Sequence, residues 1–415
     1  MNIRTLPLYV FARACPAAAM LVIALTIEKR FGSLIYGEFS VLFTLCLSAA
    51  AFFFGWIGQA VSRFSNGVDD LLRRAPQAFL MSWGISSILV ILVALVVLCF
   101  RTQATVALSV ATVVCTQGLH LIAIAMHQAR FKSSLYFGLE AFRAICITVL
   151  TIGLGTFINN GIGGLILGLS AAMLVDVCVA WISIRKYLSS EKPLYAEILE
   201  KVKEIFRYGW PISVWLSISL AIPFIDRVVL KWLGGGVEMG EYAYQYDIVF
   251  RSFTFVLLPI TISMQPALFK AYADKNFEKI DSLMKSAVSM QLLLAAGFAA
   301  ILYCAIFYVL PLGKIFLHVD KSIFVVLCVS AFFWQIALVS HKLLECEKQI
   351  LLMVSILAAS YFLLDLGVAA CLFKWLGLPG FAIGSVVGGL GYSLVALGVG
   401  NKKLNFKRLT NFPGC

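Results

Sequence analysis

Charged side chains are scarce in this chain of 415 residues. Asp, Glu, Lys and Arg together make up 13% of the sequence, whereas hydrophobic residues make up 61%. A soluble domain carries about 25% charged and about 45–50% apolar residues. Because so few polar side chains cannot cover a soluble globule of this length, the composition indicates a polytopic membrane protein.

Signatures of metal and nucleotide chemistry are missing as well. The eleven cysteines stand singly, mostly inside apolar runs, and no CxxC or Cys/His pair has the spacing of a metal site. The sequence has no GxxxxGK[ST] nucleotide-binding motif, so we expect no cofactor and no ATP hydrolysis by this chain. We expect no cleaved signal peptide either, because Arg13 and Pro16 interrupt the first apolar run.

Long apolar runs are what the chain does have. A helix needs about 20 mostly apolar residues to cross a membrane, and these runs lack the alternation of barrel strands. We therefore predict an all-α membrane protein with twelve transmembrane helices. Their expected ranges are 7–26, 38–61, 77–100, 104–126, 135–157, 161–184, 210–232, 241–265, 286–311, 322–344, 350–372 and 378–399.

Lysine and arginine are unevenly distributed among the connecting segments. If the N-terminus is cytoplasmic, 22 of them fall in cytoplasmic segments and seven in outer segments. Cytoplasmic loops carry the excess of these residues in membrane proteins, so both termini are predicted to face the cytoplasm. The same bias accounts for most of the net charge of +12, which therefore does not indicate a nucleic-acid partner.

Two short sequences recur six predicted helices apart. "YGEFSVLFTL" (36–45) resembles "MGEYAYQYDI" (239–248), and "GIGGLILGL" (161–169) resembles "GLPGFAIGS" (377–385). Because six is even, both halves enter the membrane in the same orientation, which predicts two six-helix lobes related by a pseudo-two-fold axis along the membrane normal, with a central cavity between them. The glycines at four-residue spacing in the second pair are typical of closely packed membrane helices.

The repeat predicts the division of the chain into domains. Residues 1–190 form an N-terminal lobe with the first six helices, and residues 210–415 form a C-terminal lobe with the last six and a short cytoplasmic tail. Between them, the mixed-charge stretch 191–209 is predicted to form an amphipathic connector helix at the cytoplasmic membrane surface.

Four short segments carry a resemblance to a known family. They are "EKRFGSLIYGEF" (28–39), "RYGWPISV" (207–214), "IDRVVLKWLG" (225–234) and "VEMGEYAYQY" (237–246). Together they resemble the polysaccharide-transport branch of the multidrug/oligosaccharidyl-lipid/polysaccharide flippase superfamily, the bacterial O-antigen and capsule flippases. The resemblance implies a multi-pass protein of the bacterial inner membrane.

The resemblance also implies a function, which is transport and not enzymatic catalysis. By alternating access, such a flippase moves an undecaprenyl-diphosphate-linked oligosaccharide, an O-antigen or capsule repeat unit, from the cytoplasmic to the outer leaflet. Its partners would be this lipid-linked oligosaccharide, membrane lipids, and the polymerase and chain-length regulator of polysaccharide or lipopolysaccharide synthesis. Two alternatives stay open: a multidrug/cation antiporter of the same superfamily, and a membrane polysaccharide polymerase or ligase.

Ionisable side chains inside the predicted helices are the candidate functional residues. A charge at the centre of a membrane helix costs about 2.5–3.5 kcal/mol on insertion scales and normally faces a water-filled cavity. A guanidinium binds phosphate oxygens bidentately, so four arginines are candidates for the diphosphate: Arg13, Arg143, Arg227 and Arg251.

Acidic residues in the same helices have two predicted roles. Asp226, Asp247 and Glu140 are expected to be charge partners or gating groups: Asp247 for Arg251 or Arg227, and Glu140 for Arg143 at i, i+3. Asp176 and Asp365 are candidates for binding a coupling ion, a proton or Na⁺. We expect His120 and His341 to be hydrogen-bonded structural groups.

Overall fold

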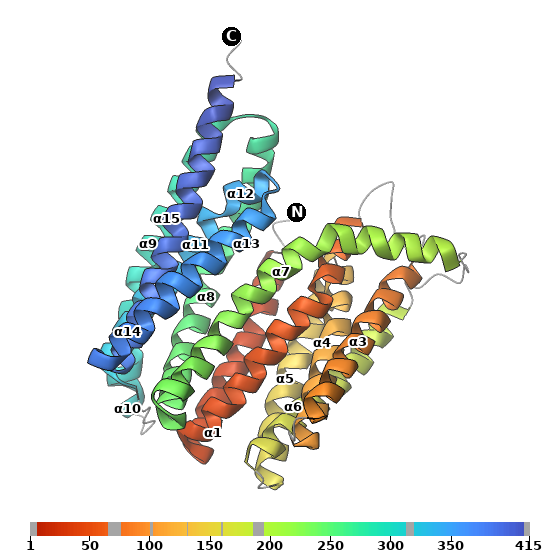
Figure 1. Ribbon diagram of the computed structural model, residues 1–415, viewed down its shortest axis with the longest axis vertical. Coiled ribbons are helices and arrows are strands. Elements are labelled where there is room, and N and C mark those ends of the chain that lie inside the picture. Colours follow the sequence, from red (N-terminus) through yellow and green to blue (C-terminus); the bar gives the residue numbers. More distant parts are fainter. Residues whose placement is uncertain are drawn as a thin grey trace. The chain divides into compact units, whose positions relative to one another are not determined.

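The computed structural model describes residues 6–64, 76–99, 103–130, 132–158, 161–185, 195–312 and 319–410. Within these ranges the chain is almost entirely helical and contains no strand, as Figure 1 shows. The all-α prediction is therefore confirmed.

The number of transmembrane helices also agrees with the prediction. The described residues hold eleven helices that are long and apolar enough to cross a membrane. The first, α1 (Leu6–Phe64), is two helices joined at Gly32, where φ is 84° and ψ is 167°. Glycine adopts this backbone conformation and other residues very rarely do, so α1 supplies both of the first two predicted spans and the total is twelve.

The chain divides into two compact units, Met1–Val229 and Leu230–Cys415. The predicted lobe boundaries at 190 and 210 follow helix topology, and they stay a prediction. The first unit contains α1, α3 (Pro76–Cys99), α4 (Ala104–Ala129), α5 (Ser133–Phe157), α6 (Ile162–Ile184) and most of α7 (Tyr195–Leu233).

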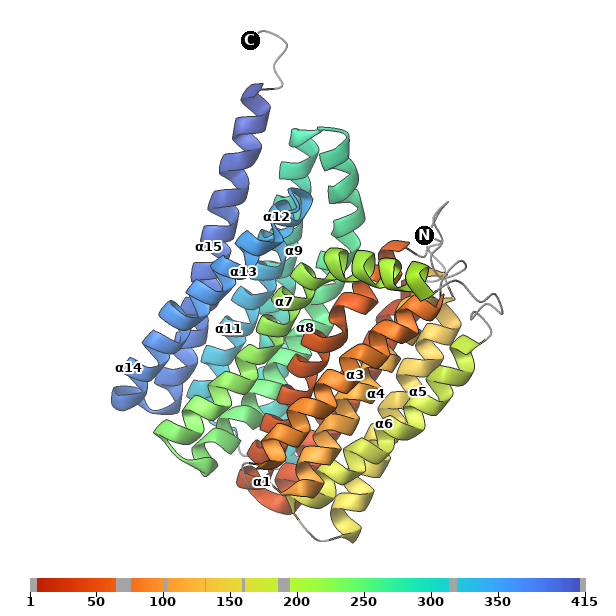
Figure 2. The ribbon, with the colours of Figure 1, turned by 45° about the vertical axis from the view of Figure 1, so that its right-hand side comes forward.

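The packing of the first unit centres on α4, α5 and α6 together with α1. These helices run alongside one another in both ribbon views (Figures 1 and 2). One close approach involves Gly168 on α6, because a methyl group there would overlap the carbonyl oxygen of Leu150 on α5. The prediction that the repeated glycines permit close helix packing is confirmed at this position.

Helix α7 differs from the expectation of a connector helix followed by a separate span. The described part of the connector and the seventh span are one helix of 39 residues, with Pro211 and Pro223 inside it. Proline removes one backbone hydrogen bond and bends a helix without always ending it. Figure 2 shows the bend, with the first turns of α7 (green) running at an angle to the rest.

The second unit holds the remaining spans. Two of these spans each contain a π-helical turn: η3 lies in the span Phe277–Val309, and η4 lies in the span Ile350–Leu376. Such turns are often found at functional sites. The elements are α8 (Gly236–Ala273), α9 (Phe277–Cys304), η3 (Ala305–Val309), α10 (Leu310–Leu312), α11 (Lys321–Ser340), α12 (Lys342–Cys346), α13 (Ile350–Ala359), η4 (Ser360–Asp365), α14 (Leu366–Leu376) and α15 (Leu378–Thr410).

The repeated glycines permit close helix packing in the second unit as well as in the first. A methyl group on Gly384 of α15 would lie 2.5 Å from the Cβ of Ala369 and 2.6 Å from the carbonyl oxygen of Asp365. Gly168 and Gly384 occupy corresponding positions of the sequence repeat, so the same small residue lets two helices approach in each unit.

Candidate functional site

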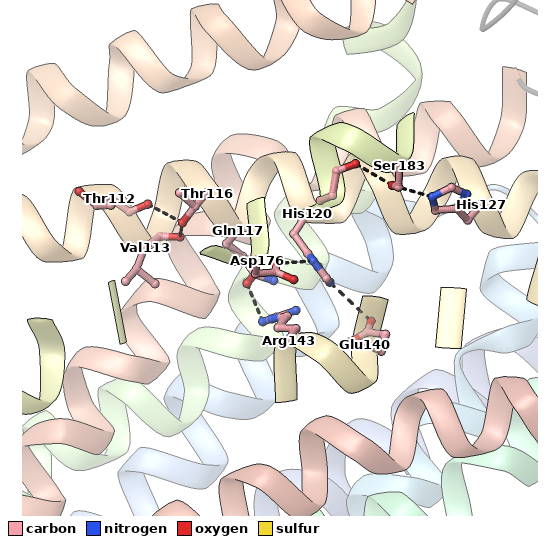
Figure 3. Close-up of polar contacts among 11 residues, drawn as sticks. Thr112, Val113, Thr116, Gln117, His120, His127, Glu140, Arg143, Asp176 and Ser183 are labelled. Carbon is pink, nitrogen blue, oxygen red and sulfur yellow. Dashed lines mark hydrogen bonds and ion pairs between the residues drawn. The ribbon is translucent and has the colours of Figure 1, made fainter. Parts of the chain in front are cut away.

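A cluster of polar side chains lies inside the first unit, where α4, α5 and α6 meet. Figure 3 shows these side chains. Gln117 and His120 come from α4, Glu140 and Arg143 from α5, and Asp176 from α6. Each pair at i, i+3 shares one helix face, so the spacing directs four of the five side chains into the same volume. We call these five residues the His120 cluster.

The imidazole of His120 lies between two carboxylates. Its Nδ1 is 2.7 Å from Asp176 Oδ2, and its Nε2 is 3.8 Å from Glu140 Oε1. The side chains of His120 and Asp176 are both 0% exposed, and that of Glu140 is 4% exposed. Charge on these buried side chains is stabilised by the contacts they make with one another.

Arg143 has its partner on the neighbouring helix. It donates a hydrogen bond of 2.6 Å to Gln117 Oε1 on α4, one turn from His120. Glu140, the partner expected from sequence, faces His120. Arg143 is partly exposed, so its guanidinium is less enclosed than the His120–Asp176 pair.

A second histidine on α4 repeats this geometry with a neutral partner. His127 Nε2 lies 2.9 Å from Ser183 Oγ, and His127 is fully buried. His127 follows His120 by seven residues, and Ser183 follows Asp176 by seven, so both pairs join α4 to α6 in the same register. The difference is that His120 faces a carboxylate and His127 a hydroxyl.

Arg227 and Asp226 lie on α7 and are each 1% exposed. Arg227 Nη1 donates a hydrogen bond to the carbonyl oxygen of Ser40 on α1 at 3.3 Å. Further hydroxyl contacts join the same two helices: Ser213 Oγ donates to the carbonyl oxygen of Ala51. Arg227 is therefore part of the packing of α7 against α1.

The predicted pair on α8 is present in the second unit. Arg251 Nη2 lies 3.2 Å from Asp247 Oδ1, one helical turn away. The Arg251 side chain is 21% exposed and that of Asp247 is 6% exposed. The guanidinium group of Arg251 is therefore more accessible than that of Arg227.

Asp365 ends the π-helical turn η4 and is buried. It accepts a hydrogen bond of 3.4 Å from Ser385 Oγ on α15, and the Ser385 hydroxyl lies 3.4 Å from the Tyr242 hydroxyl on α8. Asp365 thus belongs to a polar chain that connects three elements of the second unit. Asp365 and Asp176, the two predicted coupling residues, lie in different units.

Sequence reasoning located part of this arrangement. Glu140, Arg143 and Asp176 were predicted as site residues, and the fold brings them together. His120 and Gln117 were not predicted for this role, although their i, i+3 spacing matches that of Glu140 and Arg143. The side chain of Arg13 lies outside the described residues. Among the described residues, no group of three or more His, Cys, Asp and Glu side chains is placed to hold a metal ion.

Solved structures with a similar fold are membrane transporters. A mutant of the Vibrio cholerae MATE transporter VcmN has a TM-score of 0.64 at 16% identity, over 97% of this chain and 96% of that chain. A MOP superfamily transporter from Pyrococcus furiosus, described by the reversed polarity of its binding pocket, has a TM-score of 0.65 at 15% identity, over 97% and 95% of the two chains. At these identities the likeness shows the fold alone.

The family follows from the sequence match. Residues 32–272, more than half of the chain, match the family model described as "Polysaccharide biosynthesis protein". This chain belongs to that family. No curated protein matches the chain.

Proposed function

We propose that this protein is a flippase that moves an undecaprenyl-diphosphate-linked oligosaccharide across the bacterial inner membrane. The observation that carries the proposal is that a chain of a polysaccharide-biosynthesis family has a transporter fold made almost wholly of membrane helices. Repeat units of a surface polysaccharide, such as an O-antigen or capsule, are assembled on lipid in the cytoplasm and used outside, so this pathway needs such a transporter.

The proposed movement is alternating access, with both termini in the cytoplasm. Structures with similar folds include an inward-facing and an outward-facing multidrug resistance MATE family transporter, at TM-scores of 0.61 and 0.62. The sugar and diphosphate would pass through the protein while the polyprenyl chain stays in lipid. A polymerase and a chain-length regulator would then act on the exported unit.

The proposed phosphate ligands are Arg251 and Arg143, with Arg227 and Arg13 as further candidates. Arg251 and Arg143 are partly exposed, and a guanidinium pairs with phosphate oxygens through two parallel hydrogen bonds. Asp247 would hold Arg251 in position until the more highly charged diphosphate replaces it.

The test is complementation of a strain whose own copy of the gene has been deleted. Arg251→Ala is expected to lower surface polysaccharide at least tenfold at equal protein level, and Arg251→Lys to restore it only in part, because lysine lacks the bidentate geometry. Lys279→Ala, which removes an exposed cation at the start of α9, is the matched control. Normal surface polysaccharide in Arg251→Ala would contradict the role of Arg251.

A multidrug antiporter is the second candidate, because several solved structures with this fold are MATE transporters. Measuring surface polysaccharide and drug sensitivity in the deleted strain distinguishes the two functions. Loss of surface polysaccharide with unchanged drug sensitivity supports the flippase, and the opposite pattern supports the antiporter. A polymerase or ligase would leave lipid-linked units on the outer leaflet, whereas loss of the flippase leaves them on the cytoplasmic one.

A further inference from the structure

The tetrapeptide KWLG occurs twice in the second unit, at residues 231–234 and 374–377. The first copy ends α7 and the second ends α14. In both copies the glycine N–H donates a hydrogen bond to the carbonyl oxygen four residues earlier, at 2.8 and 2.9 Å. The chain then turns at a glycine with positive φ, Gly235 at 107° and Gly377 at 62°, a conformation that glycine adopts readily at a helix end. The repeated sequence therefore places a lysine and a tryptophan in the last turn of two helices.

Both helices end at the same surface of the membrane. Between the two ends the chain crosses the membrane four times, in the spans Gly236–Ala273, Phe277–Val309, Lys321–Cys346 and Ile350–Leu376. An even number of crossings returns the chain to the side from which it started. The orientation proposed above makes this the outer side.

The two helix ends are in contact. Phe373 directly precedes the second copy, and a methyl group on Gly234 would lie 2.7 Å from its Cζ. The Phe373 ring lies edge-on to that of Phe381, which lies edge-on to that of Tyr242 on α8, at centroid distances of 6.4 and 5.2 Å. Phe381 and Tyr242 are buried. In both ribbon views the last turns of α7 (green) and α14 (blue) lie at the same end of the second unit (Figures 1 and 2). This aromatic packing holds the two copies next to each other.

The side chains of the two copies point away from the protein. Trp232 and Trp375 are each 85% exposed, and Lys231 and Lys374, which precede them, are exposed as well. We call these four residues the KWLG surface. An indole combines an apolar ring with one N–H donor, so tryptophan is enriched where hydrocarbon meets the polar headgroups. A lysine stem can lie along apolar surface while its ammonium group reaches the polar layer.

We propose that the KWLG surface binds the headgroup phosphates of phospholipids in the outer leaflet. The indoles lie among the glycerol and upper acyl groups, and the lysine ammonium groups contact the phosphates. Glu238 and Glu241, in the first turns of α8, add carboxylates at the same end, so the surface carries both signs of charge and also accepts a zwitterionic headgroup. Contact with the headgroups fixes the depth of the second unit in the bilayer, whatever molecule the protein transports.

The first experiment measures the depth of the two indoles. The chain is reconstituted in phosphatidylcholine vesicles that carry bromine, a quencher of tryptophan fluorescence, either next to the headgroups or near the ends of the acyl chains. The difference between the wild type and Trp232→Phe/Trp375→Phe isolates the two indoles, and their fluorescence is expected to be quenched several-fold more by bromine next to the headgroups. Trp56→Phe removes a buried indole and is the matched control, with little quenching expected from either position. Equal quenching of Trp232 and Trp375 from both positions, stronger quenching by the deep bromine, or no quenching overturns the proposal.

The second experiment tests the phosphate contact, with brominated phosphatidylglycerol mixed into unbrominated phosphatidylcholine. Lys374→Gln is expected to lower the contact of this lipid with Trp375 about fivefold, the factor that one basic side chain supplies at a lipid surface. Lys279→Gln, at the start of α9 on the opposite membrane surface, is the control and should change nothing. Unchanged contact in Lys374→Gln overturns the proposal. Added undecaprenyl diphosphate should leave the quenching as it was; displacement of the phospholipid by it would assign the surface to the transported lipid and also overturn the proposal.

Discussion

Ser48 on α1 and Ser217 on α7 each donate a hydroxyl hydrogen bond to the carbonyl oxygen of the other, at 3.1 Å in both directions. Both serines are buried. The reciprocal bonds join two helices separated by 169 residues in the chain. They help to explain why most of α7 belongs to the same compact unit as α1.

Removing these hydroxyls should loosen α7 from α1. Ser48→Ala and Ser217→Ala are each expected to lower the free energy of unfolding by about 0.6–1.5 kcal/mol, the range for a hydrogen bond between membrane helices or in a protein interior. The double variant should cost less than the sum, because the two hydroxyls also contact each other. Denaturation in detergent measures the effect, with Ser219→Ala as control because its hydroxyl bonds within α7. Strict additivity would contradict the coupling.

The two repeated glycines should tolerate no side chain. Gly168→Ala and Gly384→Ala place a methyl group against facing backbone, and overpacking of this kind costs about 1–3 kcal/mol. Gly297→Ala on α9 is the matched control, since nothing lies within 4 Å of a methyl group there. Thermal unfolding in detergent should show a clear loss of stability for the first two variants and none for the third. An unchanged melting temperature in Gly168→Ala would rule out the close approach of α5 and α6.

Arg227 and Arg251 should differ in their effects on stability. Arg227→Ala leaves the groups around a fully buried guanidinium without their partner, and we expect a loss of about 3–5 kcal/mol, as when a buried ion pair is broken. Arg251→Ala removes a partly exposed i, i+4 pair and should cost about 0.5 kcal/mol. Protein yield and denaturant midpoints measure both. Equal destabilisation would contradict the structural role of Arg227.

Asp320 should make α11 sensitive to acid. It caps the helix by accepting hydrogen bonds from the backbone of Ser322 and Ile323, at 2.8 and 3.0 Å. The hydrogen bond from the Ser322 hydroxyl, with those from the backbone, lowers the pKa of Asp320 below its usual value. Because the folded-state pKa is the lower one, the ionised cap stabilises fully above about pH 4 and loses this contribution as the pH falls further.

The measurement is the unfolding free energy of the wild type and of Asp320→Ala as a function of pH. At pH 7 the variant should be less stable by about 1 kcal/mol, and the difference should narrow below about pH 4. Asp320→Asn keeps an amide oxygen as the cap and should remove the pH dependence while retaining most of the stability. A difference that stays constant down to pH 2.5 would exclude the ionised cap.

The membrane class, the twelve helices and the close packing at the repeated glycines all follow from local features of the sequence. Membrane helices must satisfy their backbone hydrogen bonds internally, so each apolar run of sufficient length has one available structure. The i, i+4 pair of Asp247 and Arg251 could also be predicted locally, because α-helical geometry alone places the two side chains on one face.

Which polar groups contact one another depends on how the helices pack in the folded protein. His120 and Asp176 are 56 residues apart, and their contact depends on the register of α4 against α6, which no local pattern encodes. The same is true of Arg227 and Ser40, which meet because α7 packs along α1. Helix propensity and hydrophobicity fix each span separately, whereas the choice of neighbour depends on the shapes of whole helix faces. For that reason a histidine that the sequence presents as an ordinary buried group becomes the centre of a charged cluster in the fold.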